Sequence, residues 1–97
     1  MKIEKNLNGY EAVLAMEGRL DTTTAPELEA EIKSLTNIET LILDMKGLEY
    51  LSSAGLRVLL AAQKTMNTQG KMIVKNVNET IMEVFEITGF VDILTIE

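Results

Sequence analysis

Residues 40–60 read TLILDMKGLEYLSSAGLRVLL, and this stretch decides the fold. Its first five residues are almost continuously apolar, which is typical of a strand buried on both faces. Residues 45–51 predict a loop. The pair Ser52-Ser53 then precedes a helix that is expected to end near Gln69, because Ser is a favoured N-cap and Gly70 suits a C-cap. A buried strand that leads into an amphipathic helix is a unit of an α/β protein.

The residues at the start of the chain predict a hairpin. Residues 3–8 and 10–17 have strand patterns, and they flank Asn8-Gly9, a dipeptide that favours a tight turn. Residues 18–21 break the strand pattern. The first two strands are therefore expected to pair antiparallel.

A first helix is predicted between the hairpin and the buried strand. Any of the threonines at 22–24 is a suitable N-cap, and Pro26 suits the first turn. Apolar residues then recur on one helical face, at Leu28, Ile32 and Leu35. This helix is expected to end near residues 36–37.

The end of the chain repeats the alternation of strand and helix. Residues 72–77 predict a strand, Asn78 could cap a third helix that ends at Gly89, and residues 93–96 predict a last short strand. The expected order is β-β-α-β-α-β-α-β. Strands separated by helices pair in parallel through right-handed crossovers, so the fold class is α/β with a mixed sheet and helices packed on it. Its length predicts a single domain over residues 1–97.

The composition excludes several classes of function. The chain has no Cys and no His, which removes thiolate nucleophiles, zinc–sulfur sites, histidine triads and imidazole ligands. Nine Lys and Arg are scattered among fifteen Asp and Glu, for a net charge of −6, so nucleic-acid binding is not expected. No apolar run approaches the ~20 residues of a membrane span. We expect a cytoplasmic protein without membrane insertion, metal or cofactor, and not an enzyme.

Two serines could carry a modification. A helix N-terminus favours anions, so a phosphate on Ser52 or Ser53 would be tolerated there. The alternative is that both serines only cap the helix. Arg57 lies one helical turn after Ser53 and could reach such a phosphate, or it could simply be solvated.

Two aspartates are candidates for other roles: Asp21 lies in the turn at 18–21, and Asp44 ends the buried strand. Asp21 could cap the first helix, hold a serine hydroxyl or contact a partner. Asp44 could cap or bind a metal, but no second carboxylate is placed beside it in the sequence. Neither aspartate predicts a catalytic site by itself.

Two motifs resemble the STAS family, the domain shared by sulfate transporters and bacterial anti-sigma factor antagonists. One is EGRLD at residues 17–21 followed by Ala25, and the other is LILD at 41–44 followed by LEYLSSAGLRVLL at 48–60. The resemblance covers almost the whole chain. It is most similar to the short antagonists that consist of this domain alone.

The resemblance implies a phosphorylation-switched binding module, an anti-sigma factor antagonist. Such proteins, when unphosphorylated, bind an anti-sigma factor that is also a serine kinase of the GHKL type, and so release a sigma factor. Phosphorylation of one serine breaks the complex, and a PP2C-type phosphatase restores it. The resemblance implies that the acceptor is Ser53. Many antagonists have an acidic residue immediately before the acceptor, whereas this chain has Ser52 there, so Ser52 is the alternative acceptor. The expected partner-binding residues are Asp21, Thr22, Ser52, Ala54 and Arg57.

Two other readings remain open from the sequence. The same fold serves as a subunit of other assemblies, such as a signalling scaffold or a lipid-transport ATPase, without a phosphorylation switch. A small enzyme is the third reading, but the sequence contains no recognisable nucleophile–base pair.

Overall fold

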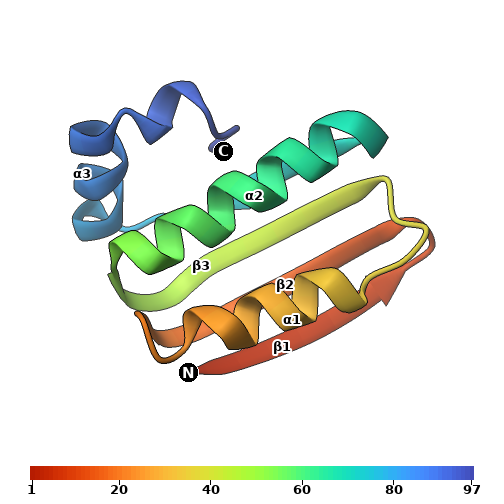
Figure 1. Ribbon diagram of the computed structural model, residues 1–97, viewed down its shortest axis with the longest axis horizontal. Helices are drawn as coiled ribbons and strands as arrows, with labels where there is room; N and C mark the ends of the chain where they lie inside the picture. Colours follow the sequence, from red (N-terminus) through yellow and green to blue (C-terminus); the bar gives the residue numbers. More distant parts are fainter.

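The structure is a computed structural model that describes all residues, 1–97. Four strands form one sheet in the order β1-β2-β3-β4 (Figure 1). The strands are β1 (Lys2–Asn8), β2 (Glu11–Leu20), β3 (Thr40–Leu51) and β4 (Lys71–Lys75). The helices are α1 (Ala25–Ser34), α2 (Ser53–Gln69), α3 (Glu79–Thr88) and the short 3₁₀ helix η1 (Phe90–Asp92).

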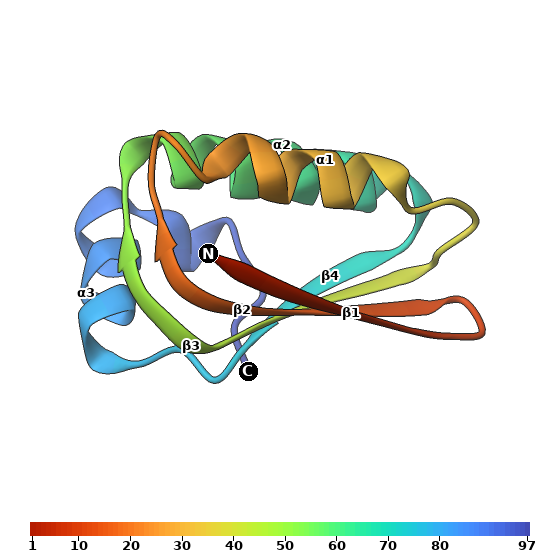
Figure 2. The same cartoon turned by 90° about the horizontal axis from the view of Figure 1, so that it is seen from below.

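The mixed sheet predicted from the sequence is confirmed. Strand β1 pairs antiparallel with β2, and β2, β3 and β4 pair in parallel. Helices α1 and α2 lie side by side over one face of the sheet, whereas α3 lies at one end of the molecule (Figure 2). None of the helices is long and apolar enough to cross a membrane.

Most of the core lies between the sheet and the helices α1 and α2, and Ile81 and Phe85 of α3 belong to the same cluster. Alternate residues of a strand point to the same face, so every second side chain of the three parallel strands is buried against the helices. From the strands these are Ala12, Leu14, Met16, Leu41, Leu43, Met45, Met72 and Val74, and from the helices Ala25, Leu28, Leu59, Ala62 and Met66.

The predicted loop at 45–51 is wrong, and so is the predicted break at 18–21. Strand β3 continues to Leu51 and β2 continues to Leu20, and the two strands stay paired to their ends. Shifts in register absorb the residues that interrupt the alternation. Gly47 lies at one shift, where a Cβ atom would approach the Met16 carbonyl oxygen to 3.0 Å.

Three other boundaries differ from the prediction. Strand β4 begins at Lys71 and ends at Lys75, whereas the prediction was 72–77. Helix α1 ends at Ser34 rather than near 36–37, because Leu35 already has an extended backbone. The predicted last strand at 93–96 is reduced to one isolated bridge between Ile96 and Val74. Residues 93 and 94 instead donate their backbone N–H groups to the Phe90 carbonyl, which continues the turn of η1 and leaves only the last residues free to pair.

Candidate functional site

The site is built where two parallel strands end side by side. Leu20 is paired with Leu51, and the Ser52 N–H donates to the Leu20 carbonyl over 2.9 Å. Each strand is followed at once by a turn into a helix. Figure 2 shows both strands bending toward the helix layer at this end, where α1 and α2 begin. The pairing therefore places Asp21 and Ser52 next to each other, although they are far apart in the sequence.

The two serines have different environments. Ser52 is the N-cap of α2, is half-buried, and its hydroxyl oxygen accepts from the Gly55 N–H over 3.5 Å. Ser53 is the first residue of α2 and is exposed, and its hydroxyl has no hydrogen bond within the protein. The prediction that a serine caps this helix is confirmed for Ser52, and Ser53 has a free hydroxyl at the surface.

Gly55 fixes how closely α2 approaches the strand ends. A Cβ atom on this buried residue would lie 2.7 Å from Leu20 Cγ and 2.7 Å from Leu51 Cδ1. Both leucines belong to the core. The first turn of α2 is therefore seated directly on the last residues of β2 and β3, and any side chain at position 55 would push it away.

The Asp21 turn is held by its own hydrogen bonds. One carboxylate oxygen, Oδ1, accepts from the Thr23 N–H over 2.9 Å, the Thr23 hydroxyl over 2.7 Å and the Thr24 N–H over 3.2 Å. The Thr23 hydroxyl bond is the largest influence on the Asp21 carboxyl, and its pKa lies below the ordinary value. Thr24 is the N-cap residue of α1 by position, but its hydroxyl bonds the Asp21 N–H and the Arg19 carbonyl instead of the helix. The expected cap of α1 by Asp21 is wrong, because the Asp21 carboxylate accepts from residues 23 and 24 ahead of the helix and α1 has no side-chain cap hydrogen bond.

An aromatic–cation pair borders the Asp21 turn and was missed by sequence reasoning. Arg19 is paired with Tyr50 across the strands, and the guanidinium carbon lies 4.1 Å from the centroid of the tyrosine ring. Arg19 Nε also lies 3.7 Å from Asp21 Oδ2. The Arg19 and Tyr50 side chains are both exposed. Only the strand register brings Arg19 and Tyr50 together. Because the sequence predicted a loop at 45–51, it predicted no strand pairing at Tyr50.

Three of the predicted partner-binding residues line one open depression between α1 and α2. Thr22, Ala54 and Arg57 surround it, together with Pro26 and Glu29 among others, and its volume is about 320 Å³. Arg57 is exposed and makes no ion pair or hydrogen bond. The predicted residues therefore form two neighbouring groups at the starts of α1 and α2. One is Thr22, Ala54 and Arg57 around the depression, and the other is Asp21 and Ser52 at the strand ends.

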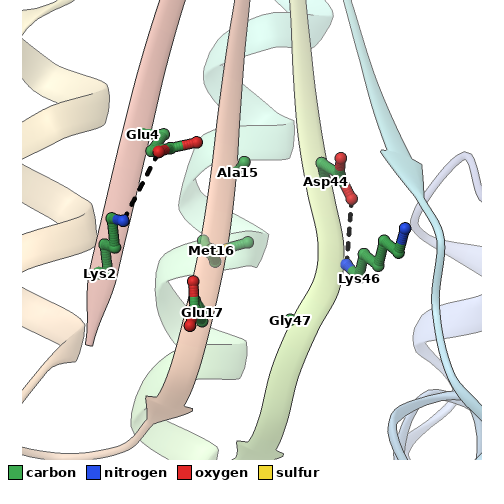
Figure 3. Close-up of a pocket in the computed structure, with 8 residues that line it drawn as sticks. All are labelled: Lys2, Glu4, Ala15, Met16, Glu17, Asp44, Lys46 and Gly47. Carbon is green, nitrogen blue, oxygen red and sulfur yellow. Dashed lines mark hydrogen bonds and ion pairs between the residues drawn. The ribbon is translucent and has the colours of Figure 1, made fainter.

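A larger hollow of about 400 Å³ lies on the other face of the sheet (Figure 3). Three of its charged side chains, Lys2, Glu4 and Asp44, have partners within the protein. Lys2 pairs with Glu4 over 3.7 Å, and the Asp44 carboxylate accepts from the Lys46 N–H and from the Asn76 amide, each over 3.0 Å. The Asn76 bond contributes most to lowering the pKa of Asp44. Asp44 thus links the middle of β3 to the residue that follows β4, and no group of three or more acidic residues is placed to hold a metal ion.

Comparison with known proteins identifies the family to which this fold belongs. The family model described as STAS domain matches residues 2–97, and the chain belongs to that family. BtrV of Bordetella bronchiseptica, provisionally named an anti-sigma factor antagonist, is 34% identical over 87 residues, which are 87% of this chain and 75% of BtrV.

Solved structures show the same fold. An anti-sigma factor antagonist from Mycobacterium paratuberculosis superposes with a TM-score of 0.88 at 22% identity, covering 98% of this chain and 83% of the other. The phosphorylated form of SpoIIAA, a Bacillus cell fate determinant, superposes with a TM-score of 0.78 at 19% identity, covering 99% of this chain and 91% of the other.

Proposed function

We propose that this protein is an anti-sigma factor antagonist that is switched off by phosphorylation of Ser53. When unphosphorylated, it binds an anti-sigma factor that is also a GHKL-type serine kinase, and a sigma factor is released. A PP2C-type phosphatase resets the switch. The name of BtrV and the membership in the STAS family support the antagonist role. The surface at the starts of α1 and α2 supports a binding role rather than catalysis.

One observation carries the choice of Ser53. Its hydroxyl is exposed at the first residue of α2 and has no partner in the protein, so a kinase active site could reach it. Ser52 is the alternative acceptor. Its hydroxyl is half-buried and accepts a hydrogen bond from the helix, which favours a structural role. The contrast between neighbouring serines supports Ser53 as the acceptor.

The proposed interface surrounds this serine. Asp21, Thr22, Ser52, Ala54 and Arg57 would contact the partner, as the family resemblance implies. The structure adds Tyr50, whose exposed ring is held under Arg19 at the edge of the Asp21 turn. Aromatic and arginine side chains are enriched among the residues that dominate binding energy, so this pair is a suitable anchor.

A phosphate on Ser53 would act on the complex rather than on the fold. It adds a charge of about −1.5 to −2 at a helix N-terminus, one turn from the unpaired Arg57, where an anion is tolerated. In the interface the same charge must be desolvated or lie against acidic groups of the partner. A loss of about 3–4 kcal/mol would weaken binding several-hundred-fold, since each ~1.4 kcal/mol is tenfold.

The test is an affinity pull-down from lysate of the native host with wild type, Ser53→Ala and Ser53→Asp as baits. We expect wild type and Ser53→Ala to retain a GHKL-type kinase and Ser53→Asp to lose it. Ser52→Asp is included to test the alternative acceptor, because it places the same charge one residue away. All variants at position 53 should keep the thermal midpoint of wild type, since an exposed, unbonded hydroxyl contributes little to stability.

Two results would reject the proposal in different ways. Equal retention of the kinase by Ser53→Asp would remove the switch at this residue, and loss with Ser52→Asp alone would move it to Ser52. Retention of scaffold components or a transport ATPase by all baits alike would instead favour a STAS subunit of another assembly.

A further inference from the structure

The last part of the chain carries nearly all the net charge. Residues 76–97 contain five acidic residues and no Lys or Arg, whereas residues 1–75 contain ten acidic and nine basic residues, for a net charge of −1. The five are Glu79, Glu83, Glu86, Asp92 and Glu97. All five are exposed, and none takes part in an ion pair within the protein.

The same segment also exposes large apolar side chains. Six large hydrophobic residues are exposed in the whole chain, and three of them, Ile87, Val91 and Ile93, fall within seven consecutive residues. Ile87 is the most exposed of the six, at 79%. Burying such side chains is favourable by about 25 cal/mol per Å², so a surface that gathers them is typical of an interaction site.

The arrangement of these residues follows from the way α3 packs. Ile81 and Phe85 are fully buried and attach one face of α3 to the core. Glu79, Glu83 and Ile87 recur at i, i+4 and i+8, which places them along one exposed stripe. Gly89 then ends α3 in a left-handed conformation, and Phe90 packs partly against the core. The buried side chains of this segment therefore hold its backbone in place, and the exposed groups have fixed positions on it.

We propose that this surface, named here the α3 ridge and made of Glu79, Glu83, Glu86, Ile87, Val91, Asp92 and Ile93, docks a basic amphipathic helix of a protein partner. The apolar side chains would contact the apolar stripe of that helix, and its Lys and Arg would face the unpaired carboxylates. A second copy of the ridge is a poor occupant, because it brings the same negative charge. This docking is separate from the Ser53 switch and goes beyond the proposed function.

The α3 ridge lies at the end of the molecule opposite the β1–β2 hairpin tip (Figure 1). This separation provides matched controls. Leu7, near the tip, is exposed at 58%, so Leu7→Ala removes a comparable apolar side chain far from the ridge. Glu27→Gln, on the exposed side of α1, removes a comparable carboxylate.

The test is an NMR titration of the isotope-labelled full chain with a synthetic helix of about 18 residues, long enough to be helical. The probe has a Leu stripe flanked by Lys, and the control peptide has Glu in place of every Lys. We expect saturable binding of the Lys peptide, with shift changes centred on residues 79–93, and no binding of the Glu peptide. Binding should weaken in high salt, because the carboxylates are exposed.

Variants separate the two contributions. Ile87→Ala should weaken binding about tenfold or more, because it removes several methyl and methylene groups from the contact. Glu83→Gln should weaken it about two- to fivefold, the range of an exposed ion pair. Leu7→Ala, Glu27→Gln and Ser53→Asp should bind as wild type does.

Three outcomes would overturn the proposal: no saturable binding of the Lys peptide, shift changes centred outside residues 79–93, or unchanged affinity of both ridge variants. None of these depends on whether Ser53 is phosphorylated, so failure here is distinguishable from failure of the antagonist function.

Discussion

The two strand-to-helix junctions of this protein start from the same geometry and end in different chemistry. Leu20 and Leu51 are paired, and each is followed by a polar residue and a helix. At the first junction the Asp21 carboxylate accepts hydrogen bonds from Thr23 and Thr24 and contacts Arg19, so this carboxylate is satisfied within the turn. At the second junction the Ser52 hydroxyl accepts one long bond and the Ser53 hydroxyl none.

The difference indicates a division of labour between neighbouring turns. A turn in which Asp21, Thr23 and Thr24 hydrogen-bond one another holds its shape and presents a fixed carboxylate and a stacked Arg19–Tyr50 pair. A turn with an unbonded, exposed hydroxyl can be modified without breaking any contact of the fold. The first junction therefore suits recognition and the second suits regulation. Substitutions at each junction should show this difference as unequal losses of stability.

The largest loss of stability is expected for Gly55→Val, which separates α2 from the paired strand ends. The new side chain would overlap the buried Leu20 and Leu51 side chains, and overpacking of this kind costs about 1–3 kcal/mol or more. We expect a thermal midpoint lower by about 10 °C or more, measured by circular dichroism. Ala61→Val, which adds a β-branched side chain on the exposed side of α2, is the control and should cost well under 1 kcal/mol. An unchanged midpoint for Gly55→Val would show that α2 is not seated as described.

A smaller loss is expected for Thr24→Val, which removes two hydrogen bonds from the first junction without changing side-chain size. The Asp21 N–H and the Arg19 carbonyl would lose their partners at 2.8 and 2.7 Å. Each such bond contributes about 0.5–1.5 kcal/mol, so urea denaturation should show a loss of about 1–3 kcal/mol. Thr22→Val is the matched control, because Thr22 is exposed and its hydroxyl makes no hydrogen bond.

The two serines of the second junction should tolerate substitution better than Thr24 of the first. Ser52→Ala should cost about 0.5–1 kcal/mol, at the low end for an N-cap, because its bond to Gly55 is long. Ser53→Ala should change stability by less than about 0.5 kcal/mol. A larger loss for Ser53→Ala than for Thr24→Val would contradict the division of labour.

The sequence was sufficient for the fold class because the helices have apolar faces and α2 and α3 have strong end signals. Asn78 caps α3 and Gly89 ends it, as predicted. The Asn-Gly turn and the apolar run at 41–43 likewise set the hairpin and the buried strand. These features are local, so they can be read from spacing alone.

The features that the sequence did not reveal depend on pairing between distant strands. The alternation of β3 is interrupted at residues 45–47, and only its partner β2 shows that the interruption is a shift in register rather than a loop. The Arg19–Tyr50 pair depends on that register. The prediction of a last strand at 93–96 was wrong for a related reason, because the turn at Phe90–Leu94 competes with pairing to β4.

The smallest expected effect is a change in the pKa of Asp21 when its hydrogen bond from Thr23 is removed. The pKa of Asp21 lies below its ordinary value of about 3.9, first because the Thr23 hydroxyl donates to the carboxylate. A carboxyl group whose pKa is depressed on folding stabilises the protein above its unfolded pKa, and that contribution is lost as the pH falls through the folded pKa. Thr23→Ala should therefore raise the pKa of Asp21 toward the ordinary value, measured from the carboxyl carbon by NMR. The pKa of Asp44, which Asn76 holds, should be unchanged in this variant. An unchanged pKa of Asp21 would show that the Thr23 hydroxyl bond does not hold the turn.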